Sequence, residues 1–216
     1  MSKGLFITLE GSDGGGKSTQ AAGLCLYLRR KGYKIVHTRE PGGTCVSEKL
    51  RAILLDPKNR IEPESEILLY EAIRAQHVRE LLTPALDKGY IVVCERFSDA
   101  TLAYQGYGRG HDKATIKKID RFATKGLTPD LTFLLDIDPG IGMRRLVRGA
   151  KKKDRIEKEA LSFHRRVRQG YLDIARKNPK RFFVINALGA EDEIHEQICA
   201  HAQKVITRRK IKPGRK

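Results

Sequence analysis

Residues 11–18 read Gly11-Ser12-Asp13-Gly14-Gly15-Gly16-Lys17-Ser18 and fit the pattern G-x4-G-K-[ST]. The apolar run LFITLE at residues 5–10 comes directly before them, and a stretch of helical composition follows. Glycines allow backbone angles that aim successive N–H groups at phosphate oxygens, and a helix N-terminus adds about half a positive charge. Lys17 can bridge the terminal phosphates of a nucleotide, and the Ser18 hydroxyl can bind Mg²⁺. The pattern therefore predicts a loop that binds Mg²⁺ with ATP or GTP, formed by Gly11, Ser12, Asp13, Gly14, Gly15, Gly16, Lys17, Ser18 and Thr19.

Outward from this loop, apolar strand-like runs alternate with helical stretches. The runs are rich in Val, Ile, Leu and Phe and do not alternate with polar residues, which is typical of a parallel sheet buried on both faces. We expect strands at residues 5–10, 34–38, 90–95, 131–137 and 182–186. We expect helices at residues 17–31, 46–56, 63–88, 141–177 with a basic interruption at 151–153, and 190–206. The pattern predicts one α/β domain over residues 1–206, a three-layer P-loop fold with a five-stranded parallel sheet.

The charge of the chain is concentrated in two places. Lys and Arg number 43 against 26 Asp and Glu, a net charge of +17. Residues 143–168 hold 11 Lys or Arg against 3 acids, and residues 207–216 hold 6 with no acid. A protein that binds double-stranded DNA would more often spread its cations over one folded face, so we expect no nucleic-acid partner. The internal segment predicts a short basic lid at about residues 143–157 that meets a local anion, and the basic end at 207–216 is expected to be disordered.

Composition also bears on the compartment. No apolar run approaches the roughly 18 residues that a membrane helix needs. The first strand-like run begins almost at Met1, so we expect no secretory leader. The four cysteines are scattered and form no CxxC pair, which favours reduced thiols. We expect a cytoplasmic protein with no membrane partner.

Two acids end apolar runs and could assist the loop. Glu95 follows IVVC and is itself followed by Arg96, whereas Asp136 follows TFLL. Ligands bind at the carboxyl ends of parallel strands, where an acid beside an arginine suits Mg²⁺ and two phosphate-bearing molecules. Asp136 and Asp138 are expected to end a strand and cap the next helix. We therefore assign Ser18 and Glu95 as the metal-binding residues.

Four further stretches stand in order behind the loop. They are REPGGT at residues 39–44, LLYEAIRAQHV at 68–78, ERFSDATLAYQGYGRG at 95–110 and DRIE at 154–157. Together they resemble the bacterial thymidylate kinase family, nucleoside monophosphate kinases that make dTDP from dTMP and ATP. The resemblance covers about residues 4–206, and it implies a homodimer as well as the reaction.

The resemblance implies roles for single residues at matching positions. Asp13 would bind the 3′-hydroxyl of dTMP. Tyr70 stands where the family has a phenylalanine that stacks on thymine, and Arg74 would donate to the thymine O4; residues four apart share one face of a helix. The full set implied for dTMP is Asp13, Glu40, Pro41, Arg51, Tyr70, Arg74, Arg96, Thr101, Tyr104 and Gln105.

Two departures from the family pattern concern catalysis. The family commonly has Asp at the position of Glu95, and the extra methylene either moves the carboxylate toward Mg²⁺ or shifts it onto a bound water. Some members carry a basic residue at the position of Gly14, whereas others place catalytic arginines in the lid; Gly14 assigns this chain to the second kind. Arg144, Arg145 and Lys151–Lys153 are expected to be solvated. The residues expected to act in catalysis are Lys17, Glu95, Arg96, Arg148 and Arg155.

Two other functions remain open from the sequence. The triplet Glu95-Arg96-Phe97 is also similar to deoxynucleoside kinases, which phosphorylate a 5′-hydroxyl. A P-loop ATPase that binds nucleic acid through the basic segments, with Asp136 as its metal-binding acid, is the second alternative. Phosphoryl transfer to dTMP is favoured, because REPGGT and Arg51 suit an acceptor that already carries a phosphate.

Overall fold

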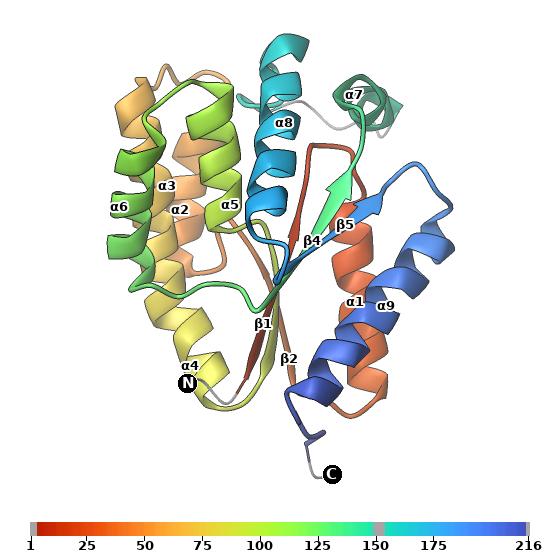
Figure 1. Ribbon diagram of the computed structural model, residues 1–216. Helices are drawn as coiled ribbons and strands as arrows, with labels where there is room; N and C mark the ends of the chain where they lie inside the picture. The colour runs from red at the N-terminus through yellow and green to blue at the C-terminus, as the bar shows by residue number, and fades with distance from the viewer. Residues whose placement is uncertain (1–3, 149–153, 215–216) are drawn as a thin grey trace.

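A computed structural model of the protein describes residues 4–148 and 154–214, apart from the side chain of Arg148. Within these residues five parallel strands form one sheet in the order β2-β3-β1-β4-β5 (Figure 1). The strands are β1 (Leu5–Glu10), β2 (Ile35–Arg39), β3 (Ile91–Glu95), β4 (Leu131–Asp136) and β5 (Phe182–Asn186). The parallel sheet expected from the apolar runs is confirmed, and β1 lies at its centre.

Helices cover both faces of the sheet and complete the three layers (Figure 1). One face carries α1 (Lys17–Arg30) and α9 (Glu191–Arg208). The other face carries α3 (Pro63–His77), its continuation through η1 (Val78–Leu82) and α4 (Thr83–Asp87), then α5 (Ser98–Thr101), η2 (Leu102–Gly108) and α8 (Leu161–Lys177). Outside α3 lie α2 (Cys45–Leu55) and α6 (Lys113–Thr124), and α7 (Pro139–Arg148) follows β4. The described residues contain no helix long and apolar enough to cross a membrane.

The central strand β1, apolar except at Thr8 and Glu10, shows why the runs do not alternate between apolar and polar residues. Leu5, Ile7 and Leu9 pack in one core with α1 and α9, whereas Phe6 packs in a second core with η1 and α4. Alternate side chains of a strand point to opposite faces, so a strand with helices on both sides has two faces to bury. Because all five strands are parallel, their carboxyl ends and the loops that follow them lie at one edge of the sheet.

Two helical segments lie where the sequence analysis assigns no element, at residues 98–108 and 113–124. The second begins at a readable signal, because the carboxylate of Asp112 accepts from the backbone N–H of Thr115 at 2.8 Å and caps α6. The first contains Gly106 and Gly108, which disfavour a helix in isolation. A Cβ at Gly108 would lie 2.7 Å from the Phe163 ring of α8, so close packing requires the glycine. Tertiary contact, not local propensity, determines η2.

The prediction that residues 207–216 are disordered is wrong for residues 207–214. Helix α9 continues to Arg208, and the Arg209 guanidinium lies 2.5 Å from the Asp130 carboxylate. Ile211 packs against the core beneath the sheet, and the Gly214 N–H donates to the Gly32 carbonyl at 3.0 Å. One apolar side chain and one ion pair hold this basic segment on the domain. Its net charge alone does not predict these contacts.

Candidate active site

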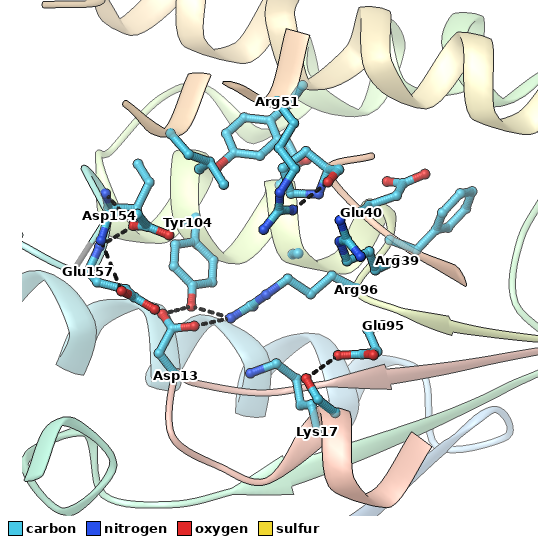
Figure 2. A pocket seen from close by; sticks show the side chains of 18 of the residues that line it. Asp13, Lys17, Arg39, Glu40, Arg51, Glu95, Arg96, Tyr104, Asp154 and Glu157 are labelled. Atoms are coloured by element: carbon cyan, nitrogen blue, oxygen red, sulfur yellow. Dashed lines mark hydrogen bonds and ion pairs between the residues drawn. The ribbon is translucent and has the colours of Figure 1, made fainter. Parts of the chain in front are cut away.

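A cavity of about 750 Å³ opens at the carboxyl ends of the strands (Figure 2). Every residue that the sequence analysis assigned to dTMP lines it, and so do Lys17, Ser18, Thr19 and Glu95. Of the loop residues, Gly14 and Gly16 also line the cavity, whereas Gly11, Ser12 and Gly15 do not. Segments far apart in the chain therefore meet in one space. The lining residues that the sequence analysis did not assign are Arg39, Leu55, Phe97, Ala100, Arg145, Leu146, Asp154, Ile156 and Glu157.

The phosphate loop has the conformation that its glycines predict. Gly16 precedes α1 with φ 85°, a left-handed angle that L residues rarely adopt. The Lys17 ammonium donates to the carbonyls of Gly11 at 3.1 Å and Ser12 at 2.8 Å, so it lies folded over the loop. Its charge is thereby placed where phosphates meet the N-terminus of α1.

Gly14 lies against the backbone of α7. A Cβ at Gly14 would lie 2.1 Å from the carbonyl oxygen of Gly142, and a Cβ at Gly142 would lie 2.2 Å from that of Asp13. No side chain fits between these two segments, and the φ of 75° at Gly14 also disfavours one. The contact of the loop with α7 therefore explains why position 14 has a glycine and no basic residue.

Burial, with a smaller effect of the Arg96 guanidinium, lowers the pKa of Lys17 to about 8. Lys17 is therefore charged at neutral pH and neutral above that value. We predict that kcat/KM for ATP falls toward tenfold per pH unit above about pH 8, because kcat/KM reports ionisations of the free enzyme. Initial rates between about pH 6.5 and pH 9.5 measure this. Lys17→Arg keeps its charge throughout and should lack this limb, and an unchanged limb in that variant would contradict the assignment.

Glu95 and Ser18 meet at the mouth of the loop. The Ser18 hydroxyl donates to Glu95 Oε2 at 2.5 Å. Burial opposes ionisation of Glu95, but hydrogen bonds from His37 and Ser18 outweigh it and lower the pKa of the carboxyl. No three His, Cys, Asp or Glu side chains of the described residues gather as a metal cage. A carboxylate and a hydroxyl beside a phosphate loop fit Mg²⁺, which is bound by one or two carboxylates together with substrate phosphates.

Arg96 extends across the floor of the cavity (Figure 2). It donates to the Asp13 carboxylate, to the Gly11 carbonyl at 3.2 Å, and to the hydroxyls of Tyr104 and Tyr171 at 3.1 Å each. The Tyr104 hydroxyl donates to Asp13 as well, at 2.8 Å. The backbone of Arg96 has φ 67°, a strained angle for a residue with a side chain. These contacts fix the guanidinium beside the phosphate loop. Tyr171 of α8, which accepts from Arg96, was not predicted from the sequence.

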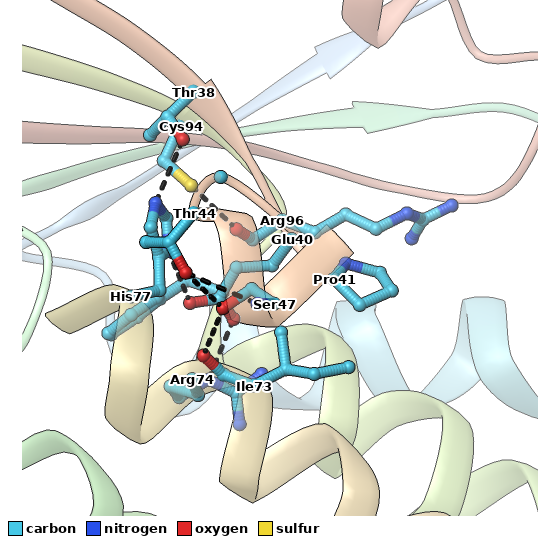
Figure 3. Close-up of polar contacts among 12 residues, drawn as sticks. Thr38, Glu40, Pro41, Thr44, Ser47, Ile73, Arg74, His77, Cys94 and Arg96 are labelled. Carbon is cyan, nitrogen blue, oxygen red and sulfur yellow. Dashed lines mark hydrogen bonds and ion pairs between the residues drawn. The ribbon is translucent and has the colours of Figure 1, made fainter. Parts of the chain in front are cut away.

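Tyr70 and Arg74 of α3 line another part of the cavity, and Figure 3 shows polar contacts around Arg74 and its neighbours. Arg74 is only 1% exposed, and its guanidinium donates to Glu40 at 2.8 Å, to Glu71 at 2.5 Å and to the Thr101 hydroxyl at 2.9 Å. Tyr70 lines the same space one turn earlier on α3. A buried arginine fixed in this way presents hydrogen-bond donors only, which suits a carbonyl oxygen of a base.

Glu40 itself is held in place by His77, the last residue of α3, which also contacts β2. The ring of His77 is fully buried and bonds through Nδ1 to Glu40 at 3.0 Å and through Nε2 to the Thr38 hydroxyl at 2.8 Å. The sequence analysis did not assign His77 or Glu71. The sequence places both residues in the helical stretch around Arg74, but it does not show that His77 contacts Glu40 of the REPGGT segment or that Glu71 accepts from Arg74.

Arg155 does not line the cavity. Its guanidinium lies 2.6 Å from Glu66 of α3 and donates to the Leu54 carbonyl at 3.0 Å. Glu66, 1% exposed, also accepts from Gln105 at 2.8 Å and from Arg109 at 2.6 Å. Glu66 thus joins the DRIE segment to the base side of the cavity, a role that the sequence analysis missed. An approach of Arg155 to ATP would require release of this ion pair.

The rest of the expected lid is described only in part. The side chain of Arg148 and residues 149–153, including Lys151–Lys153, lie outside the described residues. Arg145 is exposed, as expected, and it also lines the cavity and donates to the Ala187 carbonyl at 3.1 Å. Asp154 accepts from the N–H groups of Ile156 at 2.9 Å and Glu157 at 2.8 Å, so the DRIE motif forms a tight turn at the rim. Of the lid arginines whose side chains the structure describes, Arg144, Arg145 and Arg155, Arg145 is therefore the one that lines the cavity.

Asp136 and Asp138 have the structural roles that were expected. Asp136 ends β4 and accepts from the Arg168 guanidinium at 2.7 and 2.9 Å. Asp138 accepts from the Gly140 N–H at 2.9 Å, at the start of α7. A carboxylate already paired with an arginine is poorly placed to bind the metal of an ATPase.

Comparison with known proteins identifies the family of the chain. The family model for thymidylate kinase matches residues 9–198. Thymidylate kinase of Deinococcus radiodurans is 52% identical over 200 residues, covering 93% of this chain and 97% of the relative. That of Carboxydothermus hydrogenoformans is 50% identical over 196 residues, covering 91% and 95%.

A crystal structure of thymidylate kinase from Ehrlichia chaffeensis aligns with a TM-score of 0.76 at 35% sequence identity. The alignment covers 93% of this chain and 98% of that one. The chain has one cavity that contains a phosphate loop, the acid–arginine pair Glu95-Arg96 and the pocket around Tyr70 and Arg74. Its relatives align with it over nearly their full length. The chain belongs to the thymidylate kinase family.

Proposed function

We propose that the protein transfers the γ-phosphate of ATP to dTMP, giving dTDP and ADP. One observation carries this proposal: the phosphate loop and the pocket around Tyr70 and Arg74 open into the same cavity, with Arg96 between them. A donor on the loop and an acceptor in the pocket would then meet with their phosphates adjacent. Positioning of this kind supplies much of the catalysis in phosphoryl transfer.

The acceptor side suits a deoxythymidine nucleotide. Tyr70 would stack on the base, and Arg74 would donate to its O4. Thr101 would contact the base, while Tyr104 and Gln105 would crowd the 2′ side of the sugar and favour deoxyribose. Asp13 would accept from the 3′-hydroxyl. Glu40 and Pro41 would complete the pocket, and Arg51 and Arg96 would hold the phosphate of dTMP.

The chemistry requires neutralisation of charge more than proton transfer. The second pKa of a phosphate monoester is about 6, so the attacking oxygen is mostly deprotonated at neutral pH and needs no general base. Nucleophile and γ-phosphate are both anions, and their repulsion is the main obstacle. Lys17 and Arg96 would offset it from fixed positions that need no rearrangement during the reaction. Closure of the lid would exclude water and limit hydrolysis of ATP.

Mg²⁺ would be held by Ser18 and Glu95 beside the phosphates, and when bound it would neutralise charge on the transferring group. The arginines of the lid would contribute from the opposite side. Arg148 and Arg155 remain our proposals for that role, and the position of Arg145 on the cavity wall adds it to them.

A panel of acceptors tests the proposed function. ADP production with Mg²⁺ and ATP is measured separately for dTMP, dUMP, dCMP and thymidine. We expect dTMP to be phosphorylated fastest and dCMP to be rejected, because its exocyclic amino group would face the donors of Arg74. Faster reaction with thymidine than with dTMP would instead indicate a deoxynucleoside kinase. ATP hydrolysis stimulated by DNA, without transfer to dTMP, would indicate the nucleic-acid ATPase, and we propose no such partner.

We further propose that the protein is a cytoplasmic homodimer. Large apolar side chains are exposed on three neighbouring helices, with Leu68 of α3 57% exposed and Phe122 of α6 78% exposed, beside Val46 and Ile53 of α2. Pairing of two such faces would bury them. Light scattering should give twice the 24.4 kDa mass of the chain. The four free cysteines, three of them buried, suit a reducing compartment.

A further inference from the structure

The carboxylate of Glu95 is held from two sides. Ser18 of the phosphate loop donates to Oε2 at 2.5 Å, and His37 of β2 contacts Oε1 through Nε2 at 3.2 Å. The two side chains His37 and Glu95 are 30% and 16% exposed. β2 and β3 are neighbours in the sheet, with His37 opposite Val93 and Arg39 opposite Glu95. His37 therefore reaches the carboxylate diagonally across two adjacent strands.

The direction of the histidine hydrogen bond follows from the state of Glu95. The ordinary pKa of a glutamate carboxyl is about 4.3, so at neutral pH the carboxylate of Glu95 is ionised and can only accept hydrogen bonds. His37 Nε2 must therefore carry the proton and donate it. Each oxygen of the carboxylate thus has one donor, a hydroxyl on one and an imidazole N–H on the other.

The hydrogen bond from His37 matters because residue 95 is a glutamate and not the shorter aspartate. Glutamate has one more rotatable bond than aspartate, so a single hydrogen bond to Ser18 would leave its carboxylate free to turn. A donor on the other oxygen fixes the plane of the group and lowers the entropy lost when a ligand binds. Outer partners of this kind orient metal-binding carboxylates in many proteins.

We propose that His37 is a positioning residue that orients Glu95 toward the ion and phosphates of bound ATP. This inference rests on the proposed function, since it assigns His37 a role in that reaction. His37 acts through Glu95 and touches neither substrate. Its contribution depends on the length of the glutamate side chain and would be absent with aspartate at position 95.

The first test compares His37→Phe, which keeps a ring but has no donor, with His37→Gln, whose amide can replace Nε2. We expect His37→Phe to weaken binding of Mn²⁺ in the presence of ADP by roughly tenfold, as measured by electron paramagnetic resonance. His37→Gln should restore most of the binding, and affinity for ADP without metal should not change. His201→Phe, on α9, is the matched control and should bind as the wild type does.

The second test is a double-mutant cycle with Glu95→Asp. The shorter carboxylate cannot meet both Ser18 and His37, so His37→Phe should add less than about twofold to the loss in that background. An equal cost of His37→Phe in both backgrounds would show a role independent of Glu95 and overturn the proposal. So would unchanged Mn²⁺ binding in His37→Phe, or failure of His37→Gln to restore it.

The acceptor panel separates this inference from the proposed function. If the wild-type protein transfers phosphate to dTMP while His37→Phe binds Mn²⁺ normally, only the inference fails. If the wild type does not act on dTMP, the proposed function fails, whereas the Mn²⁺ measurements still report on His37 and Glu95.

Discussion

Replacing Arg96 with alanine is expected to lower kcat for phosphoryl transfer to dTMP by about 10³-fold, as loss of an arginine from a phosphoryl-transfer site typically does. The guanidinium is the fixed cation between the phosphate loop and the acceptor pocket, and it also holds Asp13 and Tyr104 in place. Its loss would remove both the charge and the organisation of the acceptor phosphate. A coupled assay for ADP at saturating ATP and dTMP measures the effect.

Two further variants show which property of Arg96 matters. Arg96→Lys keeps the charge but not the planar fork, so we expect an intermediate rate. Arg176→Ala, whose side chain is 74% exposed on α8, is the matched control and should be fully active. Circular dichroism should show that Arg96→Ala remains folded. A loss of less than tenfold in folded Arg96→Ala would contradict the role that we assign to this residue.

Glu66→Gln is expected to lower the free energy of unfolding by about 3 kcal/mol, because removal of one partner leaves buried cations uncompensated. The charge of Glu66 faces the guanidinium groups of Arg109 and Arg155, whose side chains are only 18% and 14% exposed. For a domain of this size the melting temperature should fall by about 6–12 °C. Urea titration and thermal melts followed by circular dichroism measure the change. Glu64→Gln, exposed on the same helix, should have almost no effect.

The pH dependence of this effect has a definite sign. Burial opposes ionisation of Glu66, but hydrogen bonds from Arg109 and Gln105 outweigh it and lower the pKa of the carboxyl in the folded protein. The stabilisation is therefore fully present above the ordinary glutamate pKa of about 4.3 and is lost as the pH falls through the lower folded value. The difference between wild type and Glu66→Gln should be constant near neutral pH and shrink in acid. A difference that grows in acid would contradict the ion pairs.

The sequence predicted the strands and the phosphate loop well because both depend on local patterns. The run at residues 5–10 is apolar except at Thr8 and Glu10, and the loop requires glycines at fixed spacing from Lys17. The residues proposed for dTMP came from motifs, and the structure brings them into one cavity because their segments all leave the sheet at the same edge.

What the sequence did not reveal depends on contacts between distant segments. Tyr171 meets Glu10 from 161 residues away, and Glu66 meets Arg109 across 43 residues. His37 touches Glu95 because β2 and β3 are neighbours, an order that apolar runs alone do not specify. Charge counts likewise could not tell that Ile211 would anchor the basic end of the chain to the core.

The contact of Gly14 with Gly142 also limits how this enzyme can diverge. The backbones of the two segments are in direct contact, so a side chain at Gly14 would require α7 to move, and a side chain at Gly142 would require the loop to move. A single substitution at either glycine is therefore disfavoured. We propose that the lid supplies the catalytic arginines, and a lineage that moved this cation into the loop would have to change both segments together. Grafting a loop arginine into this chain would accordingly require a redesigned α7, and the two segments are best exchanged between homologues as one unit.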